Sequence, residues 1–337
     1  MRLLVTGGAG YIGSVVGALL VAEGHDVIVL DDLSTGHGDA VPAGATFVQG
    51  TLRDDAPRLL AGGVDAVLHF AAKSLVSESM VRPALYWESN LGGSLALLEA
   101  MRAAGTPRIV FSSTAAVYGE PEKVPIEETA PTRPTSPYGG SKVAVDTALA
   151  EHARMHGTAA VSLRYFNVAG AYQQAGGTGA AGPWLGERHA PETHLIPNVL
   201  AVAQSAARGA GGHLTLFGDD YPTPDGTCVR DYIHVADLAR AHLLALGACQ
   251  PGQHQIYNLG SESGFSNLQV LAECRAVTGV DIPAETGPRR SGDPAVLVAS
   301  SARIRADLGS QPERDLQAMV ADAWTFTQAM ANPGAAP

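Results

Sequence analysis

The first half of the chain alternates short apolar runs with longer amphipathic segments. The amphipathic segments have helical periodicity, most clearly over Gly13–Glu23, Leu85–Ala104 and Ser141–His156. The apolar runs are rich in Val, Ile and Leu, as in buried strands, and cover Leu3–Thr6, Asp26–Leu30, Thr46–Val48, Ala66–Phe70, Arg108–Ser112 and Ala160–Arg164. This alternation predicts βαβ crossovers and a parallel sheet that is covered by helices on both faces.

The pattern changes after about residue 167. A Gly/Ala-rich stretch over 175–182 and the segment that follows it to Thr193 are predicted to form a long functional loop. The remaining elements are predicted as helices over Pro197–Arg208, Val235–Leu246 and Leu316–Met330, and as strands over Leu214–Phe217 and Gln255–Leu259. The Pro/Gly/Ala tail after Met330 is predicted to be mobile. We therefore expect a Rossmann-type doubly wound α/β sheet over 1–166 and a smaller C-terminal α/β domain over 167–337, of which about 231–262 packs back on the sheet.

Composition and charge narrow the class of partner. The 337 residues carry 22 Lys and Arg against 33 Asp and Glu, a net charge of −11. Such a negative field disfavours nucleic acid and anionic membranes as partners. No apolar run is long enough to cross a bilayer, and a strand begins directly after Met1, which predicts a cytoplasmic protein without a signal peptide.

Cysteine and histidine spacing gives no sign of a metal centre. The three cysteines form no CxxC pair, and the eleven histidines form no HExxH motif. The sequence therefore predicts no metal site and no disulfide scaffold.

A glycine-rich turn lies between the first strand and the first helix, at residues 7–13 (GGAGYIG). Glycines there permit a close backbone approach, and the helix N-terminus attracts a pyrophosphate. Asp31 ends the next strand, where a carboxylate accepts hydrogen bonds from a ribose, and Asp32 adds a second charge. Because these charges repel a 2′-phosphate, the sequence predicts NAD rather than NADP.

A tyrosine and a lysine stand one helical turn apart at Tyr138 and Lys142, just after Pro137, a typical first helical residue. For a tyrosine to act as a base at neutral pH its pKa must fall by about three units, roughly 4 kcal/mol. A helix N-terminus supplies only about 0.3–1 kcal/mol, whereas a unit charge at about 4 Å supplies on the order of 4 kcal/mol at an effective dielectric of 20. Lys142, helped by a cationic nicotinamide, is therefore expected to ionise Tyr138, with Thr114 hydrogen-bonded to the reacting oxygen.

Several motifs along the chain carry a family resemblance. They are the glycine turn, His69–Ala72, Ser112–Thr114, the Tyr138/Lys142 pair, Arg164–Asn167, Phe217–Thr223, Gly226–Val235 and Gly287–Asp293. On these motifs the chain resembles the extended short-chain dehydrogenase/reductase superfamily and, nearly end to end, its UDP-glucose 4-epimerase family. The downstream motifs are the more specific ones, since many sugar-nucleotide enzymes share the others.

The resemblance implies a redox-neutral reaction on a UDP-hexose. Tyr138 removes the proton of the 4-hydroxyl while NAD⁺ takes the C4 hydride, and the keto sugar turns before the hydride returns to its other face. The cofactor is regenerated in each turnover and should stay bound. The resemblance also implies a homodimer through two helices of the first domain, although a stripe of Leu91, Leu95 and Leu98 could equally pack on the sheet.

The resemblance further implies the site residues, with Thr114, Tyr138 and Lys142 as the catalytic ones. The residues expected at NAD are Gly7, Gly10, Tyr11, Ile12, Gly13, Asp31, Asp32, Leu33, Ser34, Thr51, Leu52, Phe70, Ala71, Ala72, Asn90, Ser112, Ser113, Tyr138, Lys142 and Tyr165. Those expected at the UDP-sugar are Thr114, Tyr138, Phe166, Asn167, His194, Leu195, Phe217, Arg230, Arg290, Asp293 and Leu297. Among them the two arginines grip the diphosphate and ribose, a role suited to guanidinium, and the aspartate accepts from ribose hydroxyls.

Four positions depart from the family pattern. Thr51 replaces an acid that contacts adenine, which weakens that contact by roughly 1 kcal/mol. His194 stands where the family often has Asn, and Lys73 lies one place before the usual lysine, so it receives no phosphate role. Leu297 aligns with an aromatic wall of the sugar pocket and is smaller, which predicts that N-acetylated UDP-hexoses are also accepted.

Other functions remain open on the same scaffold. A 4,6-dehydratase needs an acid and a base after the active-site threonine, and Ala115 and Ala116 cannot transfer protons. Epimerases of UDP-glucuronate or UDP-pentoses remain alternatives. So does a non-catalytic NAD-binding regulator, although it would not need Thr114, Tyr138 and Lys142 together.

Overall fold

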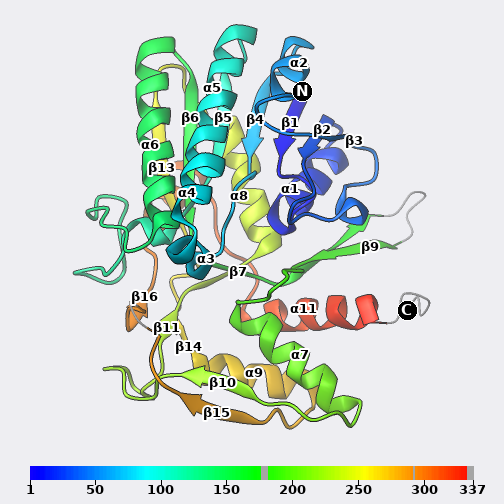
Figure 1. Ribbon diagram of the computed structural model, residues 1–337, viewed down its shortest axis with the longest axis vertical. Coiled ribbons are helices and arrows are strands. Elements are labelled where there is room, and N and C mark those ends of the chain that lie inside the picture. The colour runs from blue at the N-terminus through cyan, green and yellow to red at the C-terminus, as the bar shows by residue number, and fades with distance from the viewer. Residues whose placement is uncertain (176–180, 291–292, 332–337) are drawn as a thin grey trace.

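A seven-stranded parallel sheet forms the upper part of the molecule in Figure 1, with the strand order β13-β6-β5-β4-β1-β2-β3. Its strands are β1 (Arg2–Thr6), β2 (Asp26–Asp31), β3 (Thr46–Gln49), β4 (Ala66–His69), β5 (Arg108–Thr114), β6 (Ala159–Tyr165) and β13 (His254–Leu259). The order reverses between β1 and β4, as in doubly wound dinucleotide-binding sheets. This confirms the Rossmann-type fold class. β13, far along the chain, is the edge strand beside β6.

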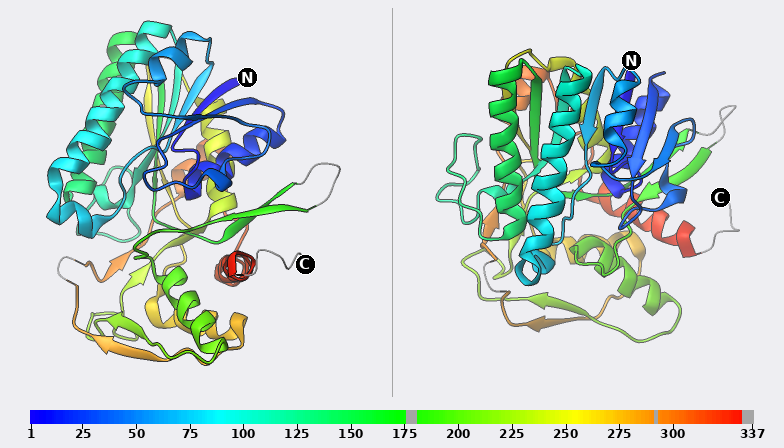
Figure 2. Two further views of the ribbon diagram at one scale, coloured as in Figure 1. Left: turned by 45° about the vertical axis from the view of Figure 1, so that its right-hand side comes forward. Right: turned by 45° about the horizontal axis from the view of Figure 1, so that its top comes forward.

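Alternating side chains of the strands build two cores, one on each face of the sheet. Leu3 and Val5 of β1 point into one core, and Leu4 between them points into the other. Helices α1 (Tyr11–Ala22) and α8 (Val235–Ala248) cover the first face; α2 (Ala56–Ala61), α5 (Gly93–Ala104) and α6 (Pro137–His156) cover the second. The left view of Figure 2 shows these helices on opposite sides of the sheet.

The lower part of the molecule is a smaller α/β unit. Its apolar centre lies between α7 (Leu195–Ala207), α9 (Asn267–Thr278) and α11 (Leu316–Ala331). Short strand pairs complete it: β10 (Leu214–Phe217) with β15 (Ala284–Gly287), and β11 (Val229–Arg230) between β14 (Phe265–Ser266) and β16 (Val296–Leu297). The strands β7 (Asn167–Ala169) and β12 (Tyr232–His234) pair beneath the large sheet, and α10 (Ala302–Leu308) packs near β13.

The helix predicted over Leu85–Ala104 is interrupted. The structure forms α3 (Val76–Val81), α4 (Pro83–Tyr86), a π-helical turn over Trp87–Gly92 and then α5. The turn contains Asn90, whose side chain bonds to the backbone of Lys73 and to Ser141 of α6. π turns are rare and frequently occur at functional sites, and this one brings Asn90 into contact with the wall segments around Lys73 and Ser141.

The predicted long loop after residue 175 is largely a hairpin. β8 (Ala171–Ala175) pairs antiparallel with β9 (Ala181–Gly186), which contains the Pro183–Leu185 segment, and the hairpin lies beside α11. The prediction of a loop was wrong for 181–186, because pairing with β8 decides this segment. The computed structural model describes residues 1–175, 181–290 and 293–331, so residues 176–180 of that loop and most of the predicted mobile tail lie outside the described residues. Within these ranges no helix combines the length and apolarity needed to cross a membrane.

Candidate active site

A cavity of about 850 Å³ opens at the carboxyl ends of the sheet strands, beside β1 and β4, from which the chain leaves toward opposite faces of the sheet. Ligands of open α/β sheets bind at this topological switch point. Most of the predicted site residues line it together: Gly7, Gly10, Tyr11, Ile12, Gly13, Asp31, Asp32, Ser34, Thr51, Leu52, Phe70, Ala71, Ala72, Ser112, Thr114, Tyr138, Lys142, Tyr165, Phe166, Asn167, His194 and Leu297. The fold therefore gathers residues that are up to 290 positions apart in the sequence.

The glycine turn forms the floor of the cavity. Gly7 has a φ of +72°, a conformation that favours glycine, and a Cβ on Gly13 would lie 2.3 Å from the carbonyl oxygen of Gly7. The helix α1 begins directly afterwards, and no side chain caps it at Gly10. Its first N–H groups are thus left for an anionic ligand.

Asp31 stands at the end of β2 and is almost fully buried. One carboxylate oxygen accepts the N–H of Leu33 at 2.8 Å and the other accepts the N–H of Ala9 at 3.0 Å. Burial raises the pKa of Asp31, while these two backbone hydrogen bonds lower it. Each oxygen keeps a second acceptor position, which suits the carboxylate for binding hydroxyl groups.

Thr51 occupies a position where the family has an acidic residue, and the carboxylate of Asp54 lies beside it. The Thr51 hydroxyl donates to Oδ2 of Asp54 at 2.8 Å, and the N–H of Asp54 lies 3.1 Å from the same hydroxyl oxygen. Both residues line the cavity, together with Leu52. Asp54 was not among the predicted site residues, although its Thr-x-x-Asp spacing from Thr51 was a local signal for this contact.

The catalytic candidates meet where β5 ends and α6 begins. Ser136 caps α6 by accepting the N–H of Gly139 at 3.2 Å, which fixes the start of the helix. Tyr138 and Lys142 then point to the end of β5, where the Lys142 ammonium donates to the carbonyl oxygen of Ser112 at 2.8 Å. Thr114 is the last residue of β5 and lines the cavity next to Tyr138.

The electrostatics of this pair differ from the sequence-based expectation. Burial raises the pKa of Tyr138, and a hydrogen bond with Thr114 lowers it. Burial also lowers the pKa of Lys142 to about 7, against the charge of Asp146. The protein by itself therefore does not ionise Tyr138, because burial penalises the charged forms of both groups.

Some predicted cofactor residues lie behind the cavity wall. The Asn90 amide donates to the Lys73 carbonyl and to the Ser141 hydroxyl, each at 3.0 Å, so it holds two wall segments together. Ser113 is fully buried and its hydroxyl faces Asp146. Neither of them lines the cavity, and the same is true of Leu33 and Leu195. The Lys73 ammonium, left without a role by the sequence, lines it and donates to Ser34 at 2.9 Å.

Four predicted substrate residues gather in the lower unit instead. Nη2 of Arg230 lies 3.3 Å from Oδ1 of Asp293, and the Arg290 guanidinium stacks 4.1 Å above the Phe217 ring. None of these four lines the large cavity. They form a cationic and aromatic group at the ends of β10, β11 and β15, while Leu297 of β16 reaches the cavity from the same unit.

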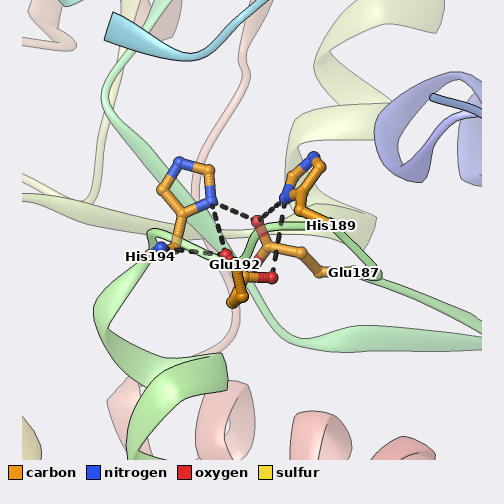
Figure 3. Close-up of side chains that lie close together, drawn as sticks. All are labelled: Glu187, His189, Glu192 and His194. Atoms are coloured by element: carbon orange, nitrogen blue, oxygen red, sulfur yellow. Dashed lines mark hydrogen bonds and ion pairs between the residues drawn. The ribbon is translucent and has the colours of Figure 1, made fainter. Parts of the chain in front are cut away.

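Four ionisable side chains meet on the connection between β9 and α7 (Figure 3): Glu187, His189, Glu192 and His194. The sequence singled out His194 alone. Burial raises the pKa of Glu187, but the two histidines outweigh it and bring the value down to about 2. Both glutamates raise the pKa of His189 to about 10.

Comparisons with known proteins identify the family of the chain. Residues 3–260 match the NAD dependent epimerase/dehydratase family. The chain is 53% identical to the UDP-glucose 4-epimerase of Corynebacterium glutamicum, over 98% of this chain and 97% of that one. It is 55% identical to the Streptomyces lividans enzyme of the same name, over 96% and 95%.

A solved structure has the same architecture. The UDP-glucose 4-epimerase from Stenotrophomonas maltophila, with bound NAD and formylated UDP-arabinopyranose, superposes with a TM-score of 0.90. The two sequences are 39% identical, and the match covers 99% of this chain and 100% of that one. The chain therefore belongs to the NAD dependent epimerase/dehydratase family and, within it, to the UDP-glucose 4-epimerase group.

Proposed function

We propose that the protein interconverts UDP-glucose and UDP-galactose with tightly bound NAD. The observation that carries this proposal is that Tyr138, Thr114 and Lys142 face the same cavity as the glycine turn and Asp31. A tyrosine base needs to lie next to both the hydride acceptor and the sugar. The cavity meets this requirement because the catalytic group, the glycine turn and Asp31 all line it.

The cavity suits a dinucleotide because it combines an uncapped helix N-terminus with a carboxylate at the end of β2. Of the residues predicted from the sequence to bind NAD, those that line the cavity would hold it. Lys73 and Asp54 join them in our proposal, Asp54 by accepting from the adenine amino group in place of the family acid. Asp31 would accept from the adenosine ribose, and its charge would select NAD against NADP.

When bound, NAD⁺ supplies a hydride acceptor and a positive charge beside the phenol. Tyr138 would accept the proton of the 4-hydroxyl as C4 is oxidised and return it to the 4-oxygen on reduction. Thr114 would hold that oxygen by a hydrogen bond, and Lys142 would fix the position of the pair through Ser112. The phenolate then depends on the cofactor charge, since the Tyr138 pKa is raised by the protein alone.

The lower unit would hold the nucleotide. Arg230 and Arg290 would bind the diphosphate and ribose, Asp293 would accept from ribose hydroxyls, and Phe217 would lie against uracil. Asn167 and His194, on the cavity wall, would contact the phosphate or sugar. Phe166 and Leu297 would bound the sugar. Since Leu297 is half-buried and small for this place, we propose that N-acetylated UDP-hexoses also fit.

We further propose a homodimer formed by α5 and α6 in the cytoplasm. Three exposed apolar side chains on these helices and on the π turn between α4 and α5 support this dimer. The exposed fractions are 42% for Trp87, 47% for Leu95 and 62% for Met155. Leu98, by contrast, is buried against the sheet.

The three cysteines are all free, which suits a reducing compartment. We divide the chain into an NAD-binding unit over 1–166 and a UDP-sugar-binding unit over 167–337, with about 231–262 assigned to the first.

Proton NMR of the purified protein with UDP-galactose and no added cofactor tests the function. We expect the anomeric signal of UDP-glucose to grow until both sugars reach equilibrium. UDP-glucuronate and UDP-pentoses, assayed in parallel, separate this function from the related epimerases. Absence of any conversion by protein that retains NAD would favour the non-catalytic regulator.

A further inference from the structure

The connection between β9 and α7 concentrates four metal-ligating side chains in eight residues, with the pattern Glu-x-His-x-x-Glu-x-His. Glu187 follows the last residue of β9, and His194 is the residue before α7. One ligand atom from each of the four side chains lies within 4.8 Å of all the others. Figure 3 shows the two imidazoles and the two carboxylates pointing at one another from this single segment.

The separations approach those of a tetrahedral site. Nδ1 of His189 lies 3.1 Å from Oε1 of Glu187 and 3.6 Å from Oε2 of Glu192. Nδ1 of His194 contacts the same Glu187 oxygen and lies 3.6 Å from Oε1 of Glu192. Zinc ligands at 2.0–2.1 Å in a tetrahedron are roughly 3.3 Å apart, so small movements of the side chains would complete the site.

A second observation favours a cation at this cluster. Nδ1 of His189 is buried and makes no hydrogen bond of normal geometry, although the Glu187 oxygen is close. The Glu187 side chain is only 7% exposed, so its carboxylate needs a cation next to it. A divalent ion would satisfy both groups, and with two neutral imidazoles it would balance the two carboxylate charges.

We propose that Glu187, His189, Glu192 and His194 bind one divalent transition-metal ion of the zinc class. Imidazole nitrogen with carboxylate oxygen suits Zn²⁺ and its neighbours better than Mg²⁺ or Ca²⁺, which prefer all-oxygen sites. Four protein ligands leave no open position, which is the mark of a structural site. The ion would brace the β9–α7 connection, which forms one wall of the cavity through Glu187, His189 and His194.

The backbone already orders the ligands for this role. One oxygen of Glu192 accepts the N–H groups of Thr193 at 2.7 Å and of His194 at 2.9 Å. Such outer contacts orient a ligating carboxylate before the metal arrives. The alternative is a cluster without a metal, in which protonated imidazoles form ion pairs with the two carboxylates.

Metal titration of the full-length protein distinguishes the two. After chelator treatment, we expect calorimetry with Zn²⁺ to show one equivalent bound per chain, and Co²⁺ to give the visible absorption of a tetrahedral complex. A chain that binds no Zn²⁺ and gives no such Co²⁺ spectrum overturns the proposal. These readouts are independent of epimerase activity, so the proposed function can fail or hold separately.

Variants locate the site. His189→Gln should weaken Zn²⁺ by more than about 100-fold, beyond the 10–100-fold typical of outer contacts. His156→Gln is the matched control, because His156 and His152 on α6 also form a close imidazole pair, with ring centroids 4.8 Å apart in an edge-to-face arrangement. Equal losses in both variants, or unchanged binding in His189→Gln, contradict the assignment. The Co²⁺ spectrum of the unaltered protein still decides if a variant does not fold.

Discussion

The Nζ atom of Lys142 lies 6.0 Å from the centre of the Tyr138 ring, one turn further along α6. It donates to the carbonyl oxygen of Ser112 rather than to the phenol. Burial raises the pKa of Tyr138 and lowers that of Lys142 to about 7, so the protein alone disfavours the charged forms of both groups. The positive charge that ionises the phenol in our mechanism therefore comes with the bound cofactor.

Removing the phenol oxygen separates catalysis from cofactor binding. We expect Tyr138→Phe to lower kcat by about 10²–10⁴-fold, the usual contribution of a general base. NAD released by denaturing the purified variant should still match one equivalent per chain. Turnover close to that of the unaltered protein would remove Tyr138 from the mechanism.

The buried Lys142 should lower the free energy of unfolding in a pH-dependent way. Its folded pKa of about 7 lies below its unfolded value, so between these values the unfolded chain binds the extra proton and stability rises with pH. The cost is therefore greatest below pH 7. We expect cofactor-free Lys142→Met to have a higher Tm than the unaltered protein at pH 6, with the difference shrinking toward pH 10.

Loss of the hydrogen bond to Ser112 opposes this gain by about 1 kcal/mol. Lys123→Met provides the control because Lys123 is exposed. The Tm difference between this variant and the unaltered protein should not shrink between pH 6 and pH 10 in the same way. A Tm difference for Lys142→Met that grows with pH contradicts the assigned pKa shift.

The contact between Thr51 and Asp54 can be tested through cofactor retention. We expect Asp54→Asn to weaken NAD binding by roughly 10-fold, because a charge-assisted hydrogen bond contributes about 1.5 kcal/mol or more. Thr51→Val should act in the same direction, since it removes the hydroxyl that donates to Asp54. Asp281→Asn, at an exposed aspartate outside the cavity, is the control. Equal retention in Asp54→Asn and the control would leave Asp54 without a role.

The size of Leu297 should set the acceptance of N-acetylated sugars. We expect the unaltered protein to convert UDP-N-acetylgalactosamine as well as UDP-galactose. Leu297→Tyr should reduce kcat/KM for the acetylated substrate while sparing the other, because the larger ring would fill the space of the acetyl group. The prediction is refuted if the unaltered protein shows no measurable reaction with the acetylated sugar. If the ratio of kcat/KM values for the two sugars is unchanged in Leu297→Tyr, another residue forms this wall of the sugar pocket.

Local patterns were sufficient for the sheet and for the cofactor end of the cavity. The Val-, Ile- and Leu-rich runs place β1 to β6 because burial on both faces requires continuous apolar strands. The glycine turn and Asp31 are each within a few residues of a strand end, so the strand order alone brings them together. The π turn at Asn90 escaped prediction because a helical hydrophobic pattern does not distinguish it from a regular helix, and the bonds of Asn90 to Lys73 and Ser141 join segments distant in sequence.

The sequence by itself determined the doubly wound fold, the position of the glycine turn and the one-turn spacing of Tyr138 and Lys142, because the hydrophobic pattern and the motif spacing that predict them are local. Only the tertiary structure decided the directions in which the pKa values of that pair shift and the convergence of Glu187, His189, Glu192 and His194. Burial and side-chain direction control both outcomes, and neither is fixed by residue type or spacing. They arise when β5 packs against α6 and when the β9–α7 connection turns back on itself.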